Sequence, residues 1–510
     1  MSHVSRRSAL GILAAGLPVT ALALAACQGS RPGPKGAAKL TYRDDVVRVE
    51  NKRAGTDAWR SGSGGLRDSD DERIQVQGYA STTSVAPGEV IDFHVTVDVP
   101  QSVTISIYRL GWYDGQGGRL VYTNPPLACQ VHPVPPADPL TGTIECRWPP
   151  ILRLRVPADW VSGLYVATFT SQSGTRGCTP FVVRDDRNPA ELCVVLPFST
   201  YQAYNQWPKD GRRGKSLYYG FPSPGAPIDP DARAFQVSFD RPYSDRGWPK
   251  QFDRDHDFVQ WVEQRGYDVT YASTVDIHTG RIDPGRYAGL IFCGHDEYWS
   301  AEMVRAADQA VQRGVSLAFL AANNVYWRIR LEPSTDGREN RIVTCYKTAP
   351  DPTAGVDGLG ATMRWRDLGG QGEHAEQRLL GVQYNGIVAA PSPLVVRNAD
   401  HWFWERCRVT DGLELPRLVG GEADGYDPAM PAPVGVNSTI LSASPYRLRN
   451  GTVHEQNTHL YETPGGALVF DAGTLHWTLA LNRRGFRNQK IQIATRNLFD
   501  RIVRQKSSGR

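Results

Sequence analysis

Polar side chains that can act as acids, bases or ligands directly follow four apolar runs of this sequence. They include two tyrosines, a glutamate, two asparagines and two histidines, namely Tyr201, Tyr204, Glu297, Asn323, Asn324, His295 and His476. In an open α/β sheet, the loops after parallel strands converge at one edge, where ligands bind. We therefore expect these residues to form one site, although each alone also has an ordinary structural role, such as a helix cap or a tight turn.

The elements that would position these residues are predicted from residue 190 onward. Continuous apolar runs at 192–197, 288–293, 315–321 and 466–470 are typical of strands buried on both faces, and they alternate with segments of helical spacing such as 300–311 and 491–503. This rhythm indicates βαβ units. The predicted fold of residues 190–508 is an α/β doubly wound domain, similar to flavodoxin or glutamine amidotransferases, with β-hairpins and long loops over 333–460.

A different pattern precedes this region. Over residues 41–187, short runs that alternate with period two, such as 88–97, 102–108 and 164–169, are separated by Gly, Pro and Asp. Such spacing indicates an immunoglobulin-like β-sandwich. Because no acid, base and nucleophile cluster there, we interpret it as a packing or spacing module.

The N-terminus has the pattern of an export signal. Arg6 and Arg7 precede an apolar stretch, and small residues come directly before Cys27. The stretch is too short and interrupted for a membrane span, and residues 1–26 are predicted to be a twin-arginine lipoprotein signal peptide. Cys27 is the candidate lipidation site, with an ordinary signal peptide as the alternative. We expect twin-arginine export and a lipid anchor at the outer face of a bacterial cell membrane, with 27–40 as a flexible tether.

Composition excludes some partners and motifs. The 510 residues carry a formal net charge of only +4 and no basic stripe, which excludes a dedicated nucleic-acid binder. No C-x-x-C or H-E-x-x-H spacing supports a zinc site. Among the cysteines other than Cys27, Cys129 and Cys146 are the best candidates for a disulfide. The expected partner is a small molecule, and association into a homo-oligomer stays open.

Four segments resemble a known family. They are TYQAYN at 200–205, SLY at 216–218, GHDEYW at 294–299 and NNVYWR at 323–328. These segments are similar to the C-terminal domain of the large (beta) subunit of N,N-dimethylformamidase, and the resemblance covers roughly residues 190–500. The resemblance implies a mononuclear iron, held by two tyrosines and one glutamate, in an enzyme that hydrolyses the C–N bond of a small amide with metal-activated water. Members of the family work with a small partner subunit, whereas this chain carries its own predicted leader.

The family's residues carry over to this chain by motif. The glutamate ligand falls on Glu297 and one tyrosine ligand on Tyr218. The second tyrosine is Tyr204, with Tyr201 left open. His295 and Asn323 match positions that contact substrate or support the ligands, and Glu422 matches a further acidic group. Two phenolates and a carboxylate form a hard, all-oxygen ligand set, which suits ferric iron better than zinc or copper.

Two other functions compete with this one. Cys293 ends a predicted strand, so it could be a nucleophile with His295 or His476 as its base. Alternatively, the chain is a non-catalytic, surface-tethered protein that binds a carbohydrate or another flat ligand on aromatic loops, with tryptophans at positions 299, 327, 402 and 404.

Overall fold

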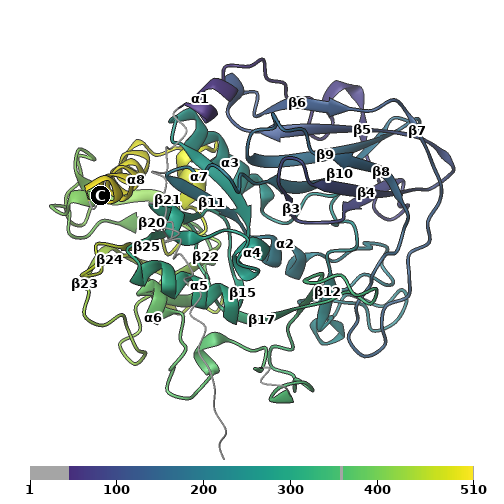
Figure 1. The fold of residues 1–510 in the computed structure, drawn as a ribbon. Coiled ribbons are helices and arrows are strands. Elements are labelled where there is room, and N and C mark those ends of the chain that lie inside the picture. The colour runs from purple at the N-terminus through teal and green to yellow at the C-terminus, as the bar shows by residue number, and fades with distance from the viewer. Residues whose placement is uncertain (1–44, 357–359, 509–510) are drawn as a thin grey trace, which may run out of the picture. The chain divides into compact units, whose positions relative to one another are not determined.

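A seven-stranded mixed sheet carries the loops that hold the candidate residues (Figure 1). The computed structural model describes residues 45–356 and 360–508. The strand order is β13 (Val269–Ser273), β11 (Leu192–Leu196), β14 (Gly289–Phe292), β16 (Ser316–Phe319), β25 (Leu468–Asp471), β24 (Val453–Glu462) and β23 (Asn437–Arg447). Neighbouring strands from β13 to β25 are parallel, whereas β24 and β23 are antiparallel.

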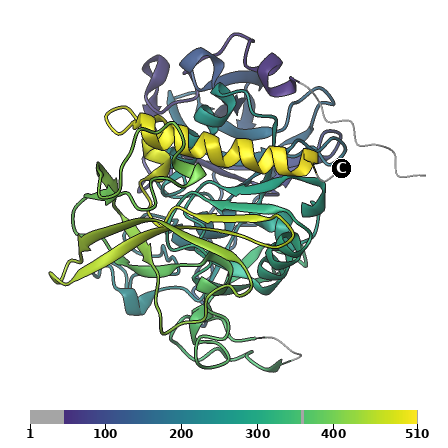
Figure 2. The same ribbon diagram turned by 90° about the vertical axis from the view of Figure 1, so that its left-hand side faces the viewer.

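Helices cover both faces of the parallel strands. Along β11, Leu192 and Val194 pack with residues of α3, α7 and α8, while Cys193 and Val195 pack with residues of α5 on the other face. Figure 2 shows α8, in yellow, running beside the sheet. The helices are α1 (Val46–Glu50), α2 (Phe198–Tyr204), α3 (Phe252–Gln264), α4 (Thr274–His278), α5 (Ala301–Gln312), α6 (Gln377–Leu380), α7 (Trp477–Asn482) and α8 (Gln489–Ser508).

The prediction of a doubly wound α/β domain is wrong. Strands take 31% of the chain and helices only 19%, and the antiparallel strands β23 and β24 extend the main sheet. Further small sheets are built from β12 (Gln236–Ser238), β18 (Ile342–Thr344), β17 (Trp327–Glu332) and β15 (Tyr298–Ser300), from β19 (Gln383–Ile387) and β22 (Glu422–Gly425), and from β20 (Ser392–Val395) and β21 (Glu414–Val419). The sequence predicts β-hairpins over 333–460, but the pairing of β24 with β25, which adds the β23–β24 hairpin to the main sheet, is not visible in local periodicity.

Two sheets pack face to face in the preceding region. One contains β1 (Arg67–Asp68), β10 (Thr175–Val183), β9 (Gly163–Ser171), β5 (Gln101–Leu110), β6 (Gly118–Thr123), β3 (Ser84–Val85) and β7 (Leu127–Cys129), and the other β2 (Val76–Ala80), β4 (Val90–Val97) and β8 (Pro150–Arg155). The ring centroids of Phe93 and Phe169 lie 6.3 Å apart between them. The immunoglobulin-like topology has no support, because the two sheets contain seven and three strands, unlike immunoglobulin domains, which have seven or nine strands in all.

The predicted bounds of one helix are confirmed. The Oγ of Ser300 accepts a hydrogen bond from the backbone N–H of Met303 at 3.2 Å, which caps α5. After the helix, Gly314 has a φ of 81°, a left-handed conformation that favours glycine.

A buried ion pair links β5 to α3. The guanidinium of Arg109 donates two hydrogen bonds to Glu263, at 2.7 and 3.0 Å, and both side chains are fully buried. The pair therefore connects the two regions on either side of the domain boundary predicted at 187–190, which itself stays a prediction.

Residues 1–26, Cys27 and the tether at 27–40 lie outside the described residues, so export and lipidation stay predictions. Searching only the described residues identifies no helix with the length and apolarity required to cross a bilayer.

The prediction of a disulfide is wrong, because Cys129 and Cys146 are both free and lie in separate hydrophobic clusters.

Candidate active site

The loops after β11, β14 and β16 bring the candidate residues together. Helix α2 follows β11 and ends at Tyr204, and the segment with His295 and Glu297 follows β14. The Oγ1 of Thr200 in α2 accepts a hydrogen bond from the backbone N–H of Glu297 at 3.0 Å, which joins the two loops. Gly294 is required at this turn, because a Cβ there would lie 2.2 Å from the carboxylate of Asp255.

Two phenols converge on the carboxylate of Glu297. The Oη of Tyr204 donates a hydrogen bond to Glu297 Oε2 at 2.8 Å, and the Oη of Tyr218 donates to Oε1 at 2.6 Å. The two tyrosine rings stack with centroids 4.4 Å apart. The turn before Tyr218 is held by Ser216, whose Oγ accepts from the Tyr218 N–H at 3.1 Å, and by buried Leu217, which hydrogen-bonds to α2. Three oxygen-bearing side chains from separate segments thus meet.

The structure separates the two tyrosines that the sequence left as alternatives. Tyr201 is buried and its phenol donates a hydrogen bond to Asp255. Tyr204, one helical turn later, turns its phenol to Glu297 instead. Tyr204 is therefore the tyrosine of this helix that belongs to the cluster.

His295 lies between two carboxylates. Its Nδ1 contacts the carbonyl oxygen of Ala322 at 3.0 Å, so the ring donates from Nδ1 and leaves Nε2 facing the site. Nε2 lies 3.2 Å from Glu297 and 3.5 Å from Glu422. Burial alone lowers the pKa of His295, but the charges of Glu422 and Glu297 outweigh it and raise the pKa above its usual value.

Asn323 and Glu422 complete the cluster. The side-chain amide of Asn323 donates to Glu422 Oε2 at 3.0 Å, and its backbone N–H donates to Asp424 at 2.8 Å. With a φ of 57°, Asn323 occupies the left-handed region that asparagine tolerates. Burial raises the pKa of Glu422, whereas His295 and neighbouring groups lower the pKa of Glu297 despite its burial.

Two lysines beside the tyrosines were missed by the sequence analysis. Lys347 is only 8% exposed, and its Nζ lies 3.4 Å from the ring centroid of Tyr218. Burial lowers the pKa of Lys347 to about 8. The Nζ of Lys250 lies 4.4 Å from the ring centroid of Tyr204. Neither lysine belongs to a recognisable motif, so only the fold could identify these contacts.

The donor set fits a hard metal ion. Among the residues that the structure describes, no group of three His, Cys, Asp or Glu side chains could hold a metal. Two phenols and a carboxylate are a different set, of oxygen donors that suit a trivalent cation. Burial raises the pKa of Tyr204 and Tyr218 well above 10, so both phenolates require a cation beside them. A cavity of about 170 Å³ is lined by both tyrosines and by Lys250, whereas Glu297 and His295 are not among its lining residues.

The remaining candidates lie elsewhere or are inaccessible. His476 contacts the carbonyl of Arg417 at 3.0 Å, and Asn324 donates to Asp471 at 3.1 Å. Cys293 is fully buried, and burial raises the pKa of its thiol well above 9. Of the four loop tryptophans, Trp299 and Trp404 are buried, so they cannot form a stacking platform for a flat ligand.

Several known proteins resemble this chain. A family model described as N,N-dimethylformamidase beta subunit-like, C-terminal, matches residues 104–491. The N,N-dimethylformamidase beta subunit of Paracoccus aminophilus is 22% identical over 283 residues, or 48% of this chain and 36% of that protein. The beta subunit from Alcaligenes sp is 22% identical over 437 residues, or 72% of this chain and 56% of that protein. The chain thus spans less than two thirds of either relative.

The matched region is wider than the resemblance seen in the motifs, since it begins within β5. Both relatives are named as subunits, which is consistent with association between chains, and a homo-oligomer stays a prediction. A cycloisomaltooligosaccharide glucanotransferase from Paenibacillus sp. is 10% identical, covers 79% of this chain and 72% of its own, and has a TM-score of 0.17, too low to assign a fold.

Proposed function

The chain belongs to the N,N-dimethylformamidase beta subunit-like family, and we propose that it hydrolyses the C–N bond of a small linear amide. One observation carries this proposal. The phenol oxygens of Tyr204 and Tyr218 lie 2.8 and 2.6 Å from the two carboxylate oxygens of Glu297, beside a cavity of about 170 Å³. Tyr204, Tyr218 and Glu297 would hold a ferric iron. When bound, such an ion polarises an amide carbonyl and makes a water acidic enough to attack it.

The protein's own residues would position the substrate and move protons. Because Nδ1 of His295 donates to Ala322, its Nε2 is the atom that can accept a proton from the attacking water and deliver it to the leaving amine. Glu422, 3.5 Å from that atom, would stabilise the protonated ring. The side-chain amide of Asn323, now bound to Glu422, would donate to the developing negative charge on the amide oxygen.

Metal analysis tests this function. We expect the full chain, produced with its leader intact, to contain about one iron per molecule and to show the colour of phenolate bound to ferric iron. A strong chelator should remove the iron together with the hydrolysis of simple amides, and added iron should restore both. An active metal-free protein would contradict the proposed site, and an iron-loaded protein that hydrolyses no amide would contradict the reaction.

Replacing Cys293 with serine separates this function from a cysteine nucleophile. We expect kcat/KM for amide hydrolysis to stay within about threefold of the wild-type value, because the thiol is fully buried and burial raises its pKa well above 9, so it is not a thiolate near neutral pH. The measurement is steady-state hydrolysis of the same amide by both proteins at equal iron content. A loss of activity with iron retained would favour the cysteine mechanism.

A further inference from the structure

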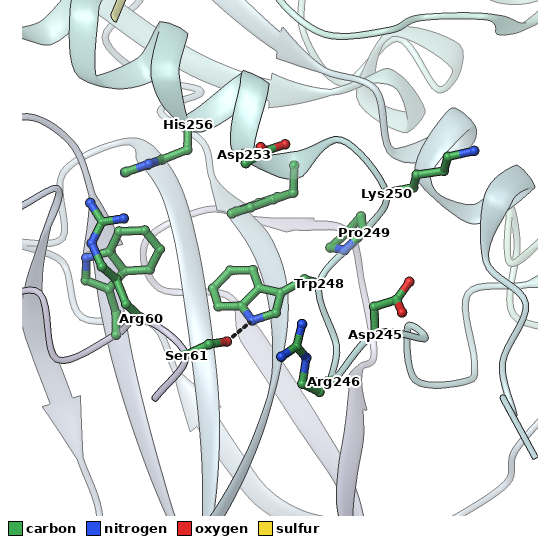
Figure 3. Close-up of a pocket in the computed structure, with 11 residues that line it drawn as sticks. Arg60, Ser61, Asp245, Arg246, Trp248, Pro249, Lys250, Asp253 and His256 are labelled. Atoms are coloured by element: carbon green, nitrogen blue, oxygen red, sulfur yellow. Dashed lines mark hydrogen bonds between the residues drawn. The ribbon is translucent and has the colours of Figure 1, made fainter. Parts of the chain in front are cut away.

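A second pocket of about 490 Å³ lies next to the candidate site (Figure 3). Its walls are aromatic. The ring centroids of Trp59 and Trp248 are 5.9 Å apart, and those of Trp248 and Phe252 are 5.1 Å apart. The indole N–H of Trp248 donates to Ser61 at 3.0 Å, which holds the ring against the opposite segment. Its volume is in the range of small-molecule sites, about 300–1,000 Å³.

The charged groups of this pocket leave a positive excess. The carboxylates at its edge are paired outside it, Asp245 with Lys209 at 2.5 Å and Asp253 with Arg483 at 2.7 Å. Arg60 also lines the pocket and forms no ion pair within 4.0 Å among the described residues, while the charges of Asp57 and Asp257 act on it from farther away.

Arg246 and His256 also line the pocket, but neither adds a free positive charge to it. Arg246 pairs with Asp68 at 2.5 Å, so it is already neutralised. His256 contributes no charge near neutral pH, because burial lowers its pKa to about 4. The contact of its ring with the carbonyl of Gly117, at 3.0 Å, acts in the opposite direction but does not outweigh burial.

Arg60 and Lys250 are thus the two cations that line the pocket and form no ion pair within the described part of the chain. The guanidinium of Arg60 lies 4.4 Å from the ring centroid of Trp59, so Arg60 is the cation on the aromatic side of the pocket.

The pocket shares a wall with the candidate active site. Pro249 and Lys250 line both this pocket and the cavity formed by Tyr204 and Tyr218. Figure 3 shows the side chain of Lys250 pointing away from Trp248. Its ammonium lies 4.4 Å from the ring centroid of Tyr204. The two cavities are therefore adjacent at Pro249 and Lys250.

We propose that this pocket binds an aromatic carboxylate group of the amide substrate, a specificity that rests on the proposed hydrolysis. Indole rings favour planar aromatic groups, and a guanidinium binds a carboxylate through two parallel hydrogen bonds. The ring would lie against Trp248 and Phe252, and the carboxylate would pair with Arg60. The substrate class is thus a small amide that carries a benzoate-like group on the side remote from the reacting carbonyl.

Benzoate binding tests the pocket without requiring catalysis. We expect benzoate to quench the tryptophan fluorescence of the full chain, and we expect Arg60→Met and Trp248→Ala to weaken binding at least about tenfold. Trp248→Phe, which keeps an aromatic wall, should bind within about threefold of wild type. Arg73→Met is the matched control, because Arg73 is exposed and pairs with Asp70 outside the pocket. No binding at about 10 mM benzoate, or equal affinity in Arg60→Met, overturns the proposal.

Hydrolysis then tests the substrate class. We expect 4-formamidobenzoate to have a kcat/KM at least about tenfold above that of formanilide, which lacks the carboxylate, and the difference to vanish in Arg60→Met. Equal kcat/KM values in the wild-type protein overturn the substrate assignment. If benzoate binding depends on Arg60 but the iron-loaded protein hydrolyses neither compound nor any simple amide, the proposed hydrolysis fails while the binding site stands.

Discussion

From the proposed function, we expect the replacement of Tyr218 with phenylalanine to lower kcat/KM for amide hydrolysis by about 100-fold or more and to abolish most of the proposed iron binding. The substitution deletes one of three converging oxygens, the one 2.6 Å from Glu297, but keeps the ring that stacks on Tyr204. Loss of a residue that merely supports a metal ligand costs about 10- to 100-fold, so loss of a ligand should cost at least the upper value. Steady-state kinetics and iron content of the purified variant measure the two effects.

The neighbouring tyrosine provides the matched control. Tyr219 is 45% exposed, and its ring centroid lies 6.3 Å from that of Tyr218. Its phenol makes no hydrogen bond to the described part of the chain. Because Tyr219 lines the same cavity as Tyr218, it is a control for iron binding and not for turnover. Tyr219→Phe should leave the iron content within about twofold of wild type. If Tyr218→Phe keeps its iron and activity, or if both variants lose iron equally, Tyr218 is not a ligand.

Arg109→Met will destabilise the fold by about 3–5 kcal/mol, because it leaves the carboxylate of Glu263 buried without its charged partner. The pair is bidentate and fully buried, and the carboxylate also accepts hydrogen bonds from Tyr271 and Asn51, both at 2.8 Å. These two donors cannot supply the missing charge. The midpoint of urea unfolding measures the loss.

A double variant distinguishes the unpaired charge from lost packing. Arg109→Met combined with Glu263→Leu should be more stable than Arg109→Met alone, since no charge is then left buried. The control is again Arg73→Met, which breaks an exposed contact of 3.5 Å with Asp70 and should cost less than about 1 kcal/mol. A double variant as unstable as the single one would show that packing, and not charge, carries the effect.

Local patterns in the sequence predict individual strands and helices, but they do not predict how the strands pair in a sheet. The apolar run at 192–197 forms β11, and the helix expected at 300–311 begins after the Ser300 cap. The hairpin of β23 and β24, at 437–462, joins the main sheet in antiparallel orientation and makes the predicted doubly wound layout wrong. Strand orientation depends on pairing with residues far along the chain, which local periodicity does not encode.

The sequence by itself determined which residue types could do chemistry, because His295, Glu297 and Asn323 directly follow apolar runs. Only the tertiary structure decided that Tyr204 and not Tyr201 faces Glu297, that Lys347 lies against Tyr218, and that Cys129 and Cys146 stay apart. The physical reason is that side chains have a direction as well as a position. The direction of a side chain depends on its position around the helix and on how loops from distant segments pack against it. Local sequence patterns contain neither kind of information.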